Sequence, residues 1–262
     1  MAKKVEEKKE VVKKEETTAA LTVGASDGAW GSEDIGSDDI TIPKILLMQP
    51  MSELVTDGIA KIGEFRSSLE KDKKLGDAET PLEVITFGSF KTWIEFKDGE
   101  YLATKKFTPE NAELPLEEVA EDGAIITRDK VLNFYCLVPK DVTNNEAFPF
   151  VLSCRRTSYN AGKTIATHIK KLQMFKKPSA AKVFTLKSNK ETNDKGTFFT
   201  IQVDVGRDST KTELETAYEW YKLLAKSKVK VDDSDLGPTA ATEAADTPLK
   251  PVHPQQPSSV TV

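Results

Sequence analysis

Short runs in which apolar and polar residues alternate dominate the middle of the chain, and this pattern predicts β-strands. The clearest runs are residues 82–87, 90–96 and 101–107, with Gly88 between the first two and an Asp98-Gly99 turn, typical of a hairpin, between the last two. We therefore expect a strand followed by a two-stranded hairpin. Further strand-like runs lie at 125–126, 131–138, 148–154, 182–188 and 197–205.

Two other stretches follow the helical period instead. Residues 160–175 predict a helix that ends before Pro178, because the residue preceding a proline avoids the helical region. A second helix is expected from Thr210 onward, since Thr210-x-x-Glu213 is a capping box. The apolar stripes consist of Ile165, His168, Ile169, Leu172 and Phe175 in the first helix, and of Leu214, Ala217, Tyr218, Tyr221, Leu224 and Ala225 in the second.

Many short strands at hairpin spacing with so few helices exclude a doubly wound parallel sheet. The predicted fold class is mainly β (α+β): a curled antiparallel sheet or an OB-like barrel with one internal helix and a C-terminal helix. The OB fold is favoured because it often places a helix between its third and fourth strands, where residues 160–175 fall. Residues 39–65 are expected to form an arm that packs on this sheet.

The two ends of the chain have a composition that cannot build a core. Residues 1–38 hold a charge-mixed run followed by a stretch rich in Thr, Ala, Gly, Ser and Asp, and residues 231–262 are acidic and proline-rich. Such segments bury too little apolar surface to offset chain entropy, so we predict that both are disordered. The remaining residues, 39–230, are predicted to form a single OB-like domain that binds nucleic acid.

The positive charge of the chain is concentrated in one segment. Residues 148–200 contain eleven Lys and Arg against two acids, a net of +9, whereas the whole chain carries −5 and the rest therefore −14. An acidic protein with such a basic segment is predicted to bind a polyanion, and nucleic acid fits best. The alternative interpretation is a solvated face whose lysines only keep the protein soluble.

Aromatic residues accompany these cations, which favours single-stranded nucleic acid. A single strand is bound by cations that follow the phosphates and by ring faces on which bases stack. Phe198 and Phe199 are neighbours in a strand and so point to opposite faces, which makes one of them a candidate for stacking. The predicted nucleic-acid-binding residues are Arg155, Arg156, Tyr159, Lys163, Lys170, Lys171, Lys182, Lys187, Phe198 and Trp93.

One motif resembles part of an enzyme site. Ala161-Gly162-Lys163-Thr164 matches the second half of a phosphate-binding P-loop, but Thr157 stands where the full pattern requires a glycine. The acids lie mostly in loops and tails, without the pairing expected of a general acid and base. We therefore predict no catalytic residues and no enzyme activity, and interpret Gly162 as part of a helix start.

The cysteines and histidines predict neither a disulfide nor a metal site. Cys136 and Cys154 lie in apolar, strand-like runs, and the chain shows no export signal, so two buried reduced thiols are expected. His168 and His253 are too few and too distant from these thiols to suggest a metal, and no cofactor is predicted. The sequence contains no run of about 18 apolar residues, so we expect a cytoplasmic protein without a membrane span.

Two stretches resemble phage-encoded single-stranded DNA-binding proteins. The first is Asp39-Ile40-x-Ile42-Pro43-Lys44-x-Leu46-Leu47-x-Gln49 with Gly58-x-Ala60-x-x-Gly63, and the second is the hairpin from Phe184-Thr185-Leu186 to Asn193-x-Lys195-Gly196-Thr197-Phe198-Phe199. The resemblance covers about residues 39–225. It implies an OB fold that coats displaced strands in phage DNA replication or recombination, in the cytoplasm of an infected bacterium. It also implies that Lys182, Lys187, Phe198, Arg155 and Lys163 line the binding groove.

Many such proteins end in an acidic tip that recruits replication partners, whereas this chain ends in Val260-Thr261-Val262. Recruitment of phage or host replication or recombination proteins would therefore use other parts of the tails. Two alternatives stay open: a phage structural or host-interaction protein whose basic segment meets an acidic protein surface, and a binder of single-stranded RNA.

Overall fold

Strand β5 (Leu82–Lys97) is the longest strand of the computed structural model, which describes residues 39–194, 196–226 and 230–232. Its first residues pair antiparallel with β10 (Lys182–Asn193), and its last residues pair at the same edge with β6 (Glu100–Lys106). The opposite edge pairs antiparallel with β8 (Ile125–Leu137) along most of its length. β5 is therefore the strand on which both halves of the sheet are built.

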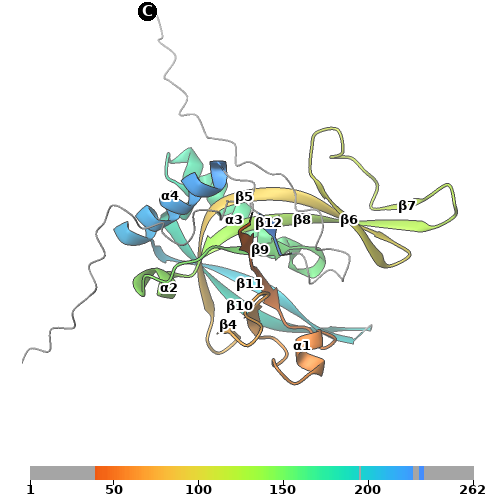
Figure 1. Cartoon of the computed structure of the whole chain (residues 1–262), viewed down its shortest axis with the longest axis horizontal. Coiled ribbons are helices and arrows are strands. Elements are labelled where there is room, and N and C mark those ends of the chain that lie inside the picture. The colour runs from red at the N-terminus through yellow and green to blue at the C-terminus, as the bar shows by residue number, and fades with distance from the viewer. Residues whose placement is uncertain (1–38, 195, 227–229, 233–262) are drawn as a thin grey trace, which may run out of the picture. The chain divides into compact units, whose positions relative to one another are not determined.

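Six further strands complete the main sheet: β2 (Lys44–Leu47), β3 (Phe65–Ser67), β4 (Lys74–Gly76), β7 (Glu117–Val119), β9 (Phe150–Cys154) and β11 (Gly196–Asp208). The order is β11-β10-β5-β8-β9-β2-β3-β4, with β6 beside β5 and β7 beside β8. The sheet is strongly curled into a half-barrel (Figure 1), and within it only β2 and β9 run parallel. The predicted fold class is confirmed, although the sheet is mixed rather than wholly antiparallel.

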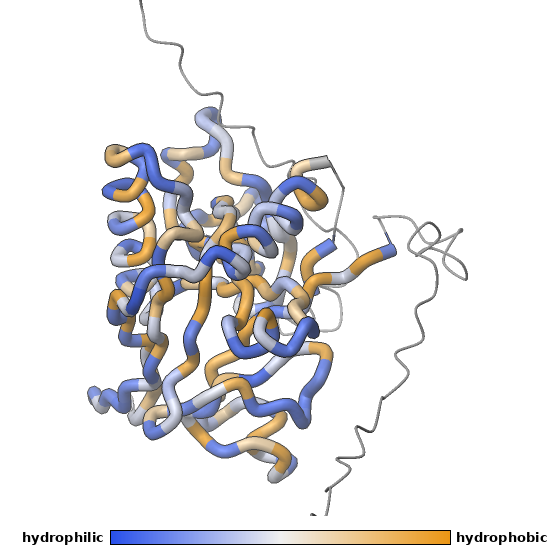
Figure 2. Tube along the Cα trace, turned by 90° about the vertical axis from the view of Figure 1, so that its left-hand side faces the viewer, coloured by the Kyte–Doolittle hydropathy of each residue, from blue (hydrophilic) through white to orange (hydrophobic). Residues whose placement is uncertain are grey.

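Helix α3 (Tyr159–Met174) packs on the inner face of the curled sheet. Its Ile165 and Ile169 belong to the same buried cluster as Phe134 of β8 and Phe184 of β10. Apolar and polar residues alternate along the strands (Figure 2), so that one face of each strand is available for this core. The inner core therefore depends on the helix that carries much of the basic segment.

A second core lies on the outer face, under helix α4 (Lys211–Lys226). Ala217 and Leu224 of this helix are buried in one cluster with Ile85 of β5 and Val183 of β10. Helix α2 (Pro139–Thr143) adds Val142 to the same cluster. The sheet is thus covered by apolar side chains on both faces.

A β-bulge at Phe87 changes which face of β5 the following residues use. Thr86 pairs with Cys136 and Gly88 pairs with Tyr135, so Phe87 is an extra residue in the ladder. Because side chains alternate with a period of two, one inserted residue exchanges the faces beyond it. Phe87 and Phe90, three positions apart, consequently both pack in the outer core.

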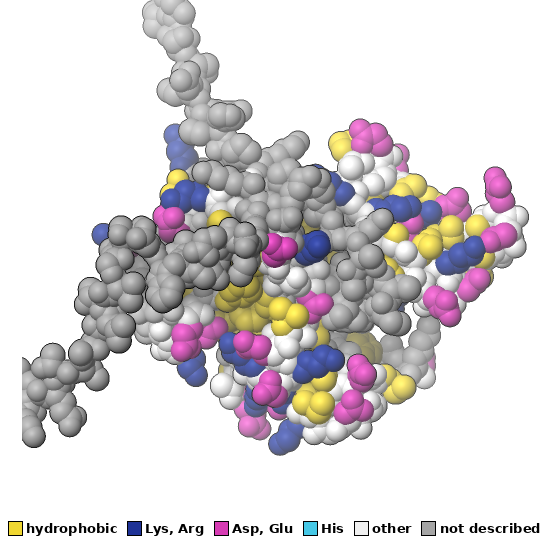
Figure 3. Space-filling model, in the orientation of Figure 1, with side chains coloured by type: hydrophobic (Ala, Val, Ile, Leu, Met, Phe, Trp, Pro, Cys, Tyr) yellow, Lys and Arg dark blue, Asp and Glu magenta, His cyan; other side chains and the backbone are white. Residues whose placement is uncertain are grey.

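The ends of β5 and β8, together with β6 and β7, project away from the helices (Figure 1). We call residues 98–125 the acidic arm, because they contain eight Asp and Glu against two lysines. Acidic side chains are visible along this projection beside exposed apolar ones (Figure 3). At the base of the arm Glu95 and Arg128 are both buried, and the Arg128 Nε donates a hydrogen bond to Glu95 Oε1 at 2.8 Å.

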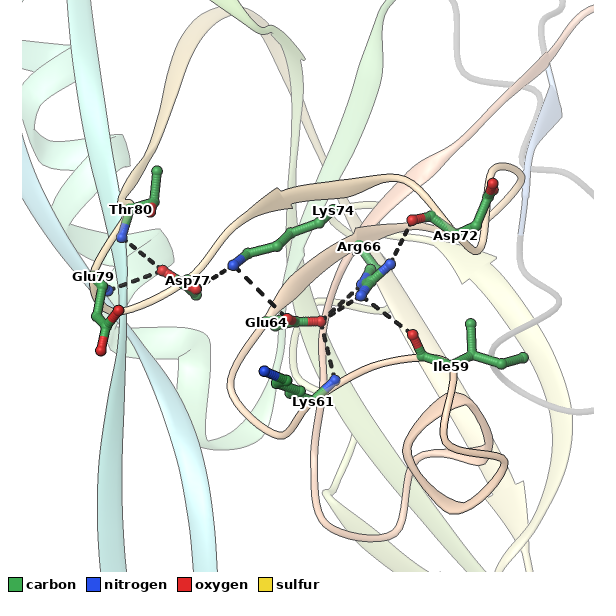
Figure 4. A network of polar contacts seen from close by, with 9 residues as sticks. All are labelled: Ile59, Lys61, Glu64, Arg66, Asp72, Lys74, Asp77, Glu79 and Thr80. Carbon is green, nitrogen blue, oxygen red and sulfur yellow. Dashed lines mark hydrogen bonds and ion pairs between the residues drawn. The ribbon is translucent and has the colours of Figure 1, made fainter.

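Residues 39–65, predicted to form an arm packed on the sheet, instead contribute strand β2 to the sheet itself, and the region that follows is held by a polar network centred on Glu64 (Figure 4). Glu64 Oε2 accepts hydrogen bonds from the Lys61 N–H and from Arg66 Nε, both at 3.0 Å, and from Arg66 Nη2 at 2.6 Å. Burial alone would raise the pKa of Glu64, but these contacts and Lys74 together hold it below its ordinary value. The network ties β3 to β4 and to helix α1 (Glu53–Thr56) through the Ile59 carbonyl, so we assign it a structural role.

The predicted helices agree with the structure to within a residue at their starts, and the capping box is present. The Thr210 N–H donates to Glu213 Oε2 at 2.6 Å, and the Glu213 N–H donates to Thr210 Oγ1 at 3.3 Å. Phe175 does not belong to the buried stripe, because α3 ends at Met174 and the Phe175 side chain is 67% exposed. The predicted disordered segments, apart from Val231 and Asp232, lie outside the described residues.

Candidate nucleic-acid interface

Most of the basic segment is a continuous part of the fold without acids. No Asp or Glu occurs between Glu146 and Glu191, and this stretch builds β9, the short 3₁₀ turn η1 (Arg156–Ser158), α3, a second turn η2 (Ser179–Ala181) and most of β10. The structure divides its cations into two groups. One group contacts carboxylates supplied by neighbouring strands, and the other lies along α3.

Four of the predicted site residues belong to the first group. These pairs are Arg155 and Arg156 with Asp129 at 3.7 and 2.6 Å, Lys182 with Asp208 at 2.9 Å, and Lys187 with Asp204 at 3.0 Å. The pKa of Asp208 is lowered chiefly by the hydrogen bond from Lys182, with a further contribution from Lys177. The positive charge at these strand ends is thus largely balanced locally.

The second group follows one edge of α3. Lys163 and Lys170 are seven residues apart, close to two helical turns, so they lie on the same side of α3, and Lys177 continues the row just beyond the helix end, where it lines a groove described below. All three are exposed, and none forms an ion pair with a described residue. We call this row the α3 lysine edge. Lys171 is also exposed, but it points about 100° away from Lys170 around the helix, so we remove it from the predicted binding residues.

Two cations flank α3 in an uncommon backbone conformation. Arg156 just before the helix has φ of 46°, and Lys176 just after it has φ of 55°. The other non-glycine residues with positive φ in the described part of the chain are Asp98 and Asn145, whose short polar side chains suit this region. A cation at each of these positions requires the surrounding fold to hold a strained backbone.

A groove of about 860 Å³ lies where the α3 lysine edge ends. We call it the outer groove: its walls come from the bulged part of β5, the end of β6, the C-terminal end of α3 with η2, and α4. Gln173 and Lys177 line it on the α3 side, and Lys91 and Lys106 line it on the opposite side. The residues that line it include three lysines but no Asp or Glu. It is therefore an electropositive groove in an acidic protein.

Aromatic rings form much of the wall of this groove. Phe90 and Phe107 line it from the β5 and β6 side, and Tyr218 and Tyr221 line it from α4. The ring of Phe90 lies 5.0 Å from that of Tyr135, and cations approach two of the other rings. The measured distances from cation to ring centroid are 5.3 Å for Lys91 and 4.9 Å for Lys130 at Phe107, and 4.9 Å for Lys222 at Tyr218.

Trp93 does not lie in the interface but behind it. Its side chain is 1% exposed, its Nε1 donates to the Asn111 carbonyl at 3.0 Å, and its ring stacks on Phe107 at 5.8 Å. A ring enclosed in this way has no face on which a base could stack, so we remove Trp93 from the candidate stacking residues. It supports Phe107, which lines the outer groove.

The two other predicted aromatic residues are half-buried and lie apart from the outer groove. Tyr159 begins α3, and Lys163 Nζ lies 5.2 Å from its ring centroid. Burial raises the pKa of the Tyr159 hydroxyl. Phe198 lies on β11, opposite Glu191 of β10. The structure thus brings Tyr159 together with Lys163 of the α3 lysine edge.

The sequence did not identify the outer groove. Tyr218 and Tyr221 were assigned to the apolar stripe of the C-terminal helix, and Phe90 and Phe107 to hairpin strands. A sequence signal does exist: Phe90-Lys91 at the start of the first hairpin strand and Lys106-Phe107 at the end of the second each place an aromatic ring beside a lysine. Their approach to α4, more than a hundred residues later, follows only from the fold.

The P-loop-like motif is part of α3. A Cβ on Gly162 would lie 2.7 Å from the Cβ of Cys154 and 3.1 Å from Leu132 Cδ1, so the glycine allows the helix to approach the sheet. The Thr164 hydroxyl donates to the Asn160 carbonyl at 3.1 Å, within the same helix. Packing therefore accounts for both residues without a bound phosphate.

The two cysteines are free thiols in the inner core. Cys136 and Cys154 are both buried, and burial raises the pKa of each, that of Cys154 to about 12. Among the described residues, no group of three or more His, Cys, Asp or Glu side chains is arranged to hold a metal ion. None of the described helices is long and apolar enough to cross a membrane.

These features define a mainly β protein with a basic segment that is largely free of acids, an electropositive groove and an acidic arm. Comparison with known families shows that the chain belongs to the family of Pam3 phage gp34-like proteins, which it matches over residues 12–230. The phage origin that the sequence resemblance implied is thereby confirmed. Comparisons with curated proteins and with solved structures gave no match.

Proposed function

We propose that this phage protein binds single-stranded DNA without catalysis and coats exposed strands during phage DNA replication or recombination, in the cytoplasm of the infected host. The observation that carries the proposal is the α3 lysine edge, which leads into the acid-free outer groove. Lys163, Lys170 and Lys177 are exposed and make no ion pair with a described carboxylate, so their charge is available to an external anion.

The spacing of these lysines fits a linear polyanion better than a compact one. Seven helical residues span about 10 Å, so Lys163 and Lys170 are separated by about that distance along α3, and Lys177 adds a third charge beyond the helix end, where it lines the outer groove. A flexible strand can follow such a row with its phosphates, and each contact releases a condensed counterion. Binding should therefore weaken steeply as salt concentration rises.

Titration of a fluorescein-labelled oligothymidylate, followed by fluorescence anisotropy at several salt concentrations, tests the proposal. Loss of one phosphate contact in Lys170→Ala should reduce the slope of log K against log salt by about 0.7 in magnitude. Lys171→Ala is the matched control, because it removes the same charge from the adjacent position and a different side of α3. Its slope should equal that of the parent protein.

Two results would overturn the proposal. The first is a parent protein that does not bind the oligonucleotide even at low salt. The second is an equal loss of slope in Lys170→Ala and Lys171→Ala, which would mean that net charge rather than a defined lysine row attracts the strand. A parallel titration with oligouridylate distinguishes DNA from RNA as the preferred strand, since only RNA carries the 2′-hydroxyl.

A further inference from the structure

We infer that the outer groove is the place where bases of the bound single strand are received, with Phe90, Phe107 and Tyr218 as stacking rings. This inference rests on the proposed function and locates base binding on the outer face of the sheet, away from Phe198. It commits the groove to one occupant, an unpaired nucleotide, on the basis of its charge and its aromatic walls.

The charge of the groove argues against a purely apolar ligand. Lys91 and Lys106 lie on one side and Lys177 on the other, and the lining contains no carboxylate, although Asp208 outside it interacts with Lys177. A purely apolar ligand would leave the ammonium groups of Lys91 and Lys106 without a counter-charge in the groove. An anionic ligand with an apolar, planar part can pair its negative charge with the lysines and stack its planar part on the aromatic walls. A nucleotide has this composition.

The aromatic side chains are positioned before any ligand arrives. The ring of Phe107 is supported by Trp93 at 5.8 Å, and that of Phe90 by Tyr135 at 5.0 Å. Tyr218 stands at the opposite wall and is 59% exposed. Rings held in place by a second layer of rings lose little freedom on binding, which favours stacking of a base.

The backbone supplies the reason for this arrangement. The bulge at Phe87 turns Phe90 to the outer face, where α4 lies, and the C-terminal end of α3, which packs in the inner core, also lines the groove. Bulges commonly redirect a side chain next to a functional site. Without the extra residue, Phe90 would face the inner core and the groove would lose one of its rings.

The groove also explains how the protein would select single strands. In a duplex the bases are paired and stacked on one another, so their faces are not accessible to protein rings. The α3 lysine edge can contact the phosphates of either form. Discrimination would therefore come from the groove, and binding should depend on the presence of bases and not only on the number of phosphates.

An abasic oligonucleotide of the same length and charge as the oligothymidylate separates the two contributions. The parent protein should bind oligothymidylate more tightly than the abasic strand. Tyr218→Ala should weaken oligothymidylate binding by roughly five- to a hundredfold, the range found for loss of one stacking ring, and leave abasic binding unchanged. Phe175→Ala is the matched control, because Phe175 is 67% exposed and does not line the groove.

Each outcome has a distinct meaning. Absence of binding to both oligonucleotides rejects the proposed function and this inference together. Equal affinity of the parent for both strands rejects base binding in the groove but leaves phosphate binding by α3 intact. An equal loss for both strands in Tyr218→Ala, with an unchanged urea midpoint, would show that Tyr218 contacts the backbone and would also overturn the inference.

Discussion

The side-chain amide of Gln49 forms two hydrogen bonds with the backbone of Phe199, across the open side of the half-barrel. Gln49 Nε2 donates to the Phe199 carbonyl at 2.9 Å, and the Phe199 N–H donates to Gln49 Oε1 at 2.9 Å. The amide thus takes the place that a neighbouring strand would have beside β11. Gly63 lies against the Phe199 ring at the same point, so the two stretches that carry the sequence resemblance meet in space.

Replacement of Gln49 by alanine should destabilise the domain. Two hydrogen bonds would be lost and two backbone groups of Phe199 left without this partner, so we expect the free energy of unfolding to fall by about 2 kcal/mol. Urea denaturation should show a lower midpoint with an unchanged slope. Gln202→Ala on the exposed side of β11 is the control and should stay within about 0.5 kcal/mol; equal stability of Gln49→Ala and the parent would argue against these bonds in solution.

Gly162→Ala should also destabilise, although alanine is the better helix former. Helix propensity favours alanine by about 1 kcal/mol, but the added Cβ would meet the Cβ of Cys154, which cannot move without the backbone of β9. Overpacking of this kind costs about 1–3 kcal/mol, so we expect a net loss in thermal unfolding. Thr164→Ala on the exposed side of α3 is the comparison and should be neutral or slightly stabilising. A raised melting temperature for Gly162→Ala would contradict the close approach of α3 to the sheet.

Lys176→Gly should stabilise the protein. The residue follows the C-cap of α3 at φ of 55°, and the Lys177 N–H returns to the Leu172 carbonyl at 3.0 Å in the pattern of a Schellman motif. Glycine relieves the steric cost of this conformation, about 1–2 kcal/mol, and part of that gain is offset by the greater entropy of the unfolded chain. The net gain in unfolding free energy should be about 0.5–1 kcal/mol. Lys171→Gly, inside the same helix, should have the opposite sign.

Stability should fall in acid partly through Glu95. Burial raises the pKa of this carboxyl, but the hydrogen bonds and charges of Lys105 and Arg128 together lower it by more. Its pKa in the folded protein therefore lies below that in the unfolded chain. A group of this kind stabilises the fold above the unfolded pKa of about 4.3, and the contribution is lost as pH falls from there through the folded value. Urea titrations across this range should show a weaker pH dependence in Glu95→Gln than in the parent. Glu100→Gln, which removes a carboxylate from the same arm outside the buried pair, controls for net charge and should keep the dependence of the parent.

Local signals made the helices and most strands predictable from sequence. The capping box at Thr210 starts the C-terminal helix as expected, whereas α3 ends before Pro178 through the Schellman motif at Lys176 rather than through the proline. Gly88 was interpreted as a break between two strands, but β5 continues through it because a bulge at Phe87 absorbs the irregularity. Sequence alone does not distinguish a bulge from a turn when both use the same residue types.

The site was less predictable, because its parts come from distant segments. The lysines of residues 163–177 were found by composition, whereas the balancing acids Asp129, Asp204 and Asp208 depend on strand register. The sequence does not show which face of the sheet an aromatic residue in a strand uses, so the burial of Trp93 could not be predicted. The outer groove is formed by β5, β6, α3 and α4 together, and the periodicity of the sequence does not predict that these elements come together.

The short parallel pair of β1 (Thr41–Ile42) and β12 (Lys230–Val231) joins the two ends of the described chain. On the ribosome, β1 is made first, and its partner emerges only after nearly all of the remaining domain. The nascent protein must therefore keep β1 unpaired until β12 has been synthesised, and we expect this pairing to be among the last steps of folding.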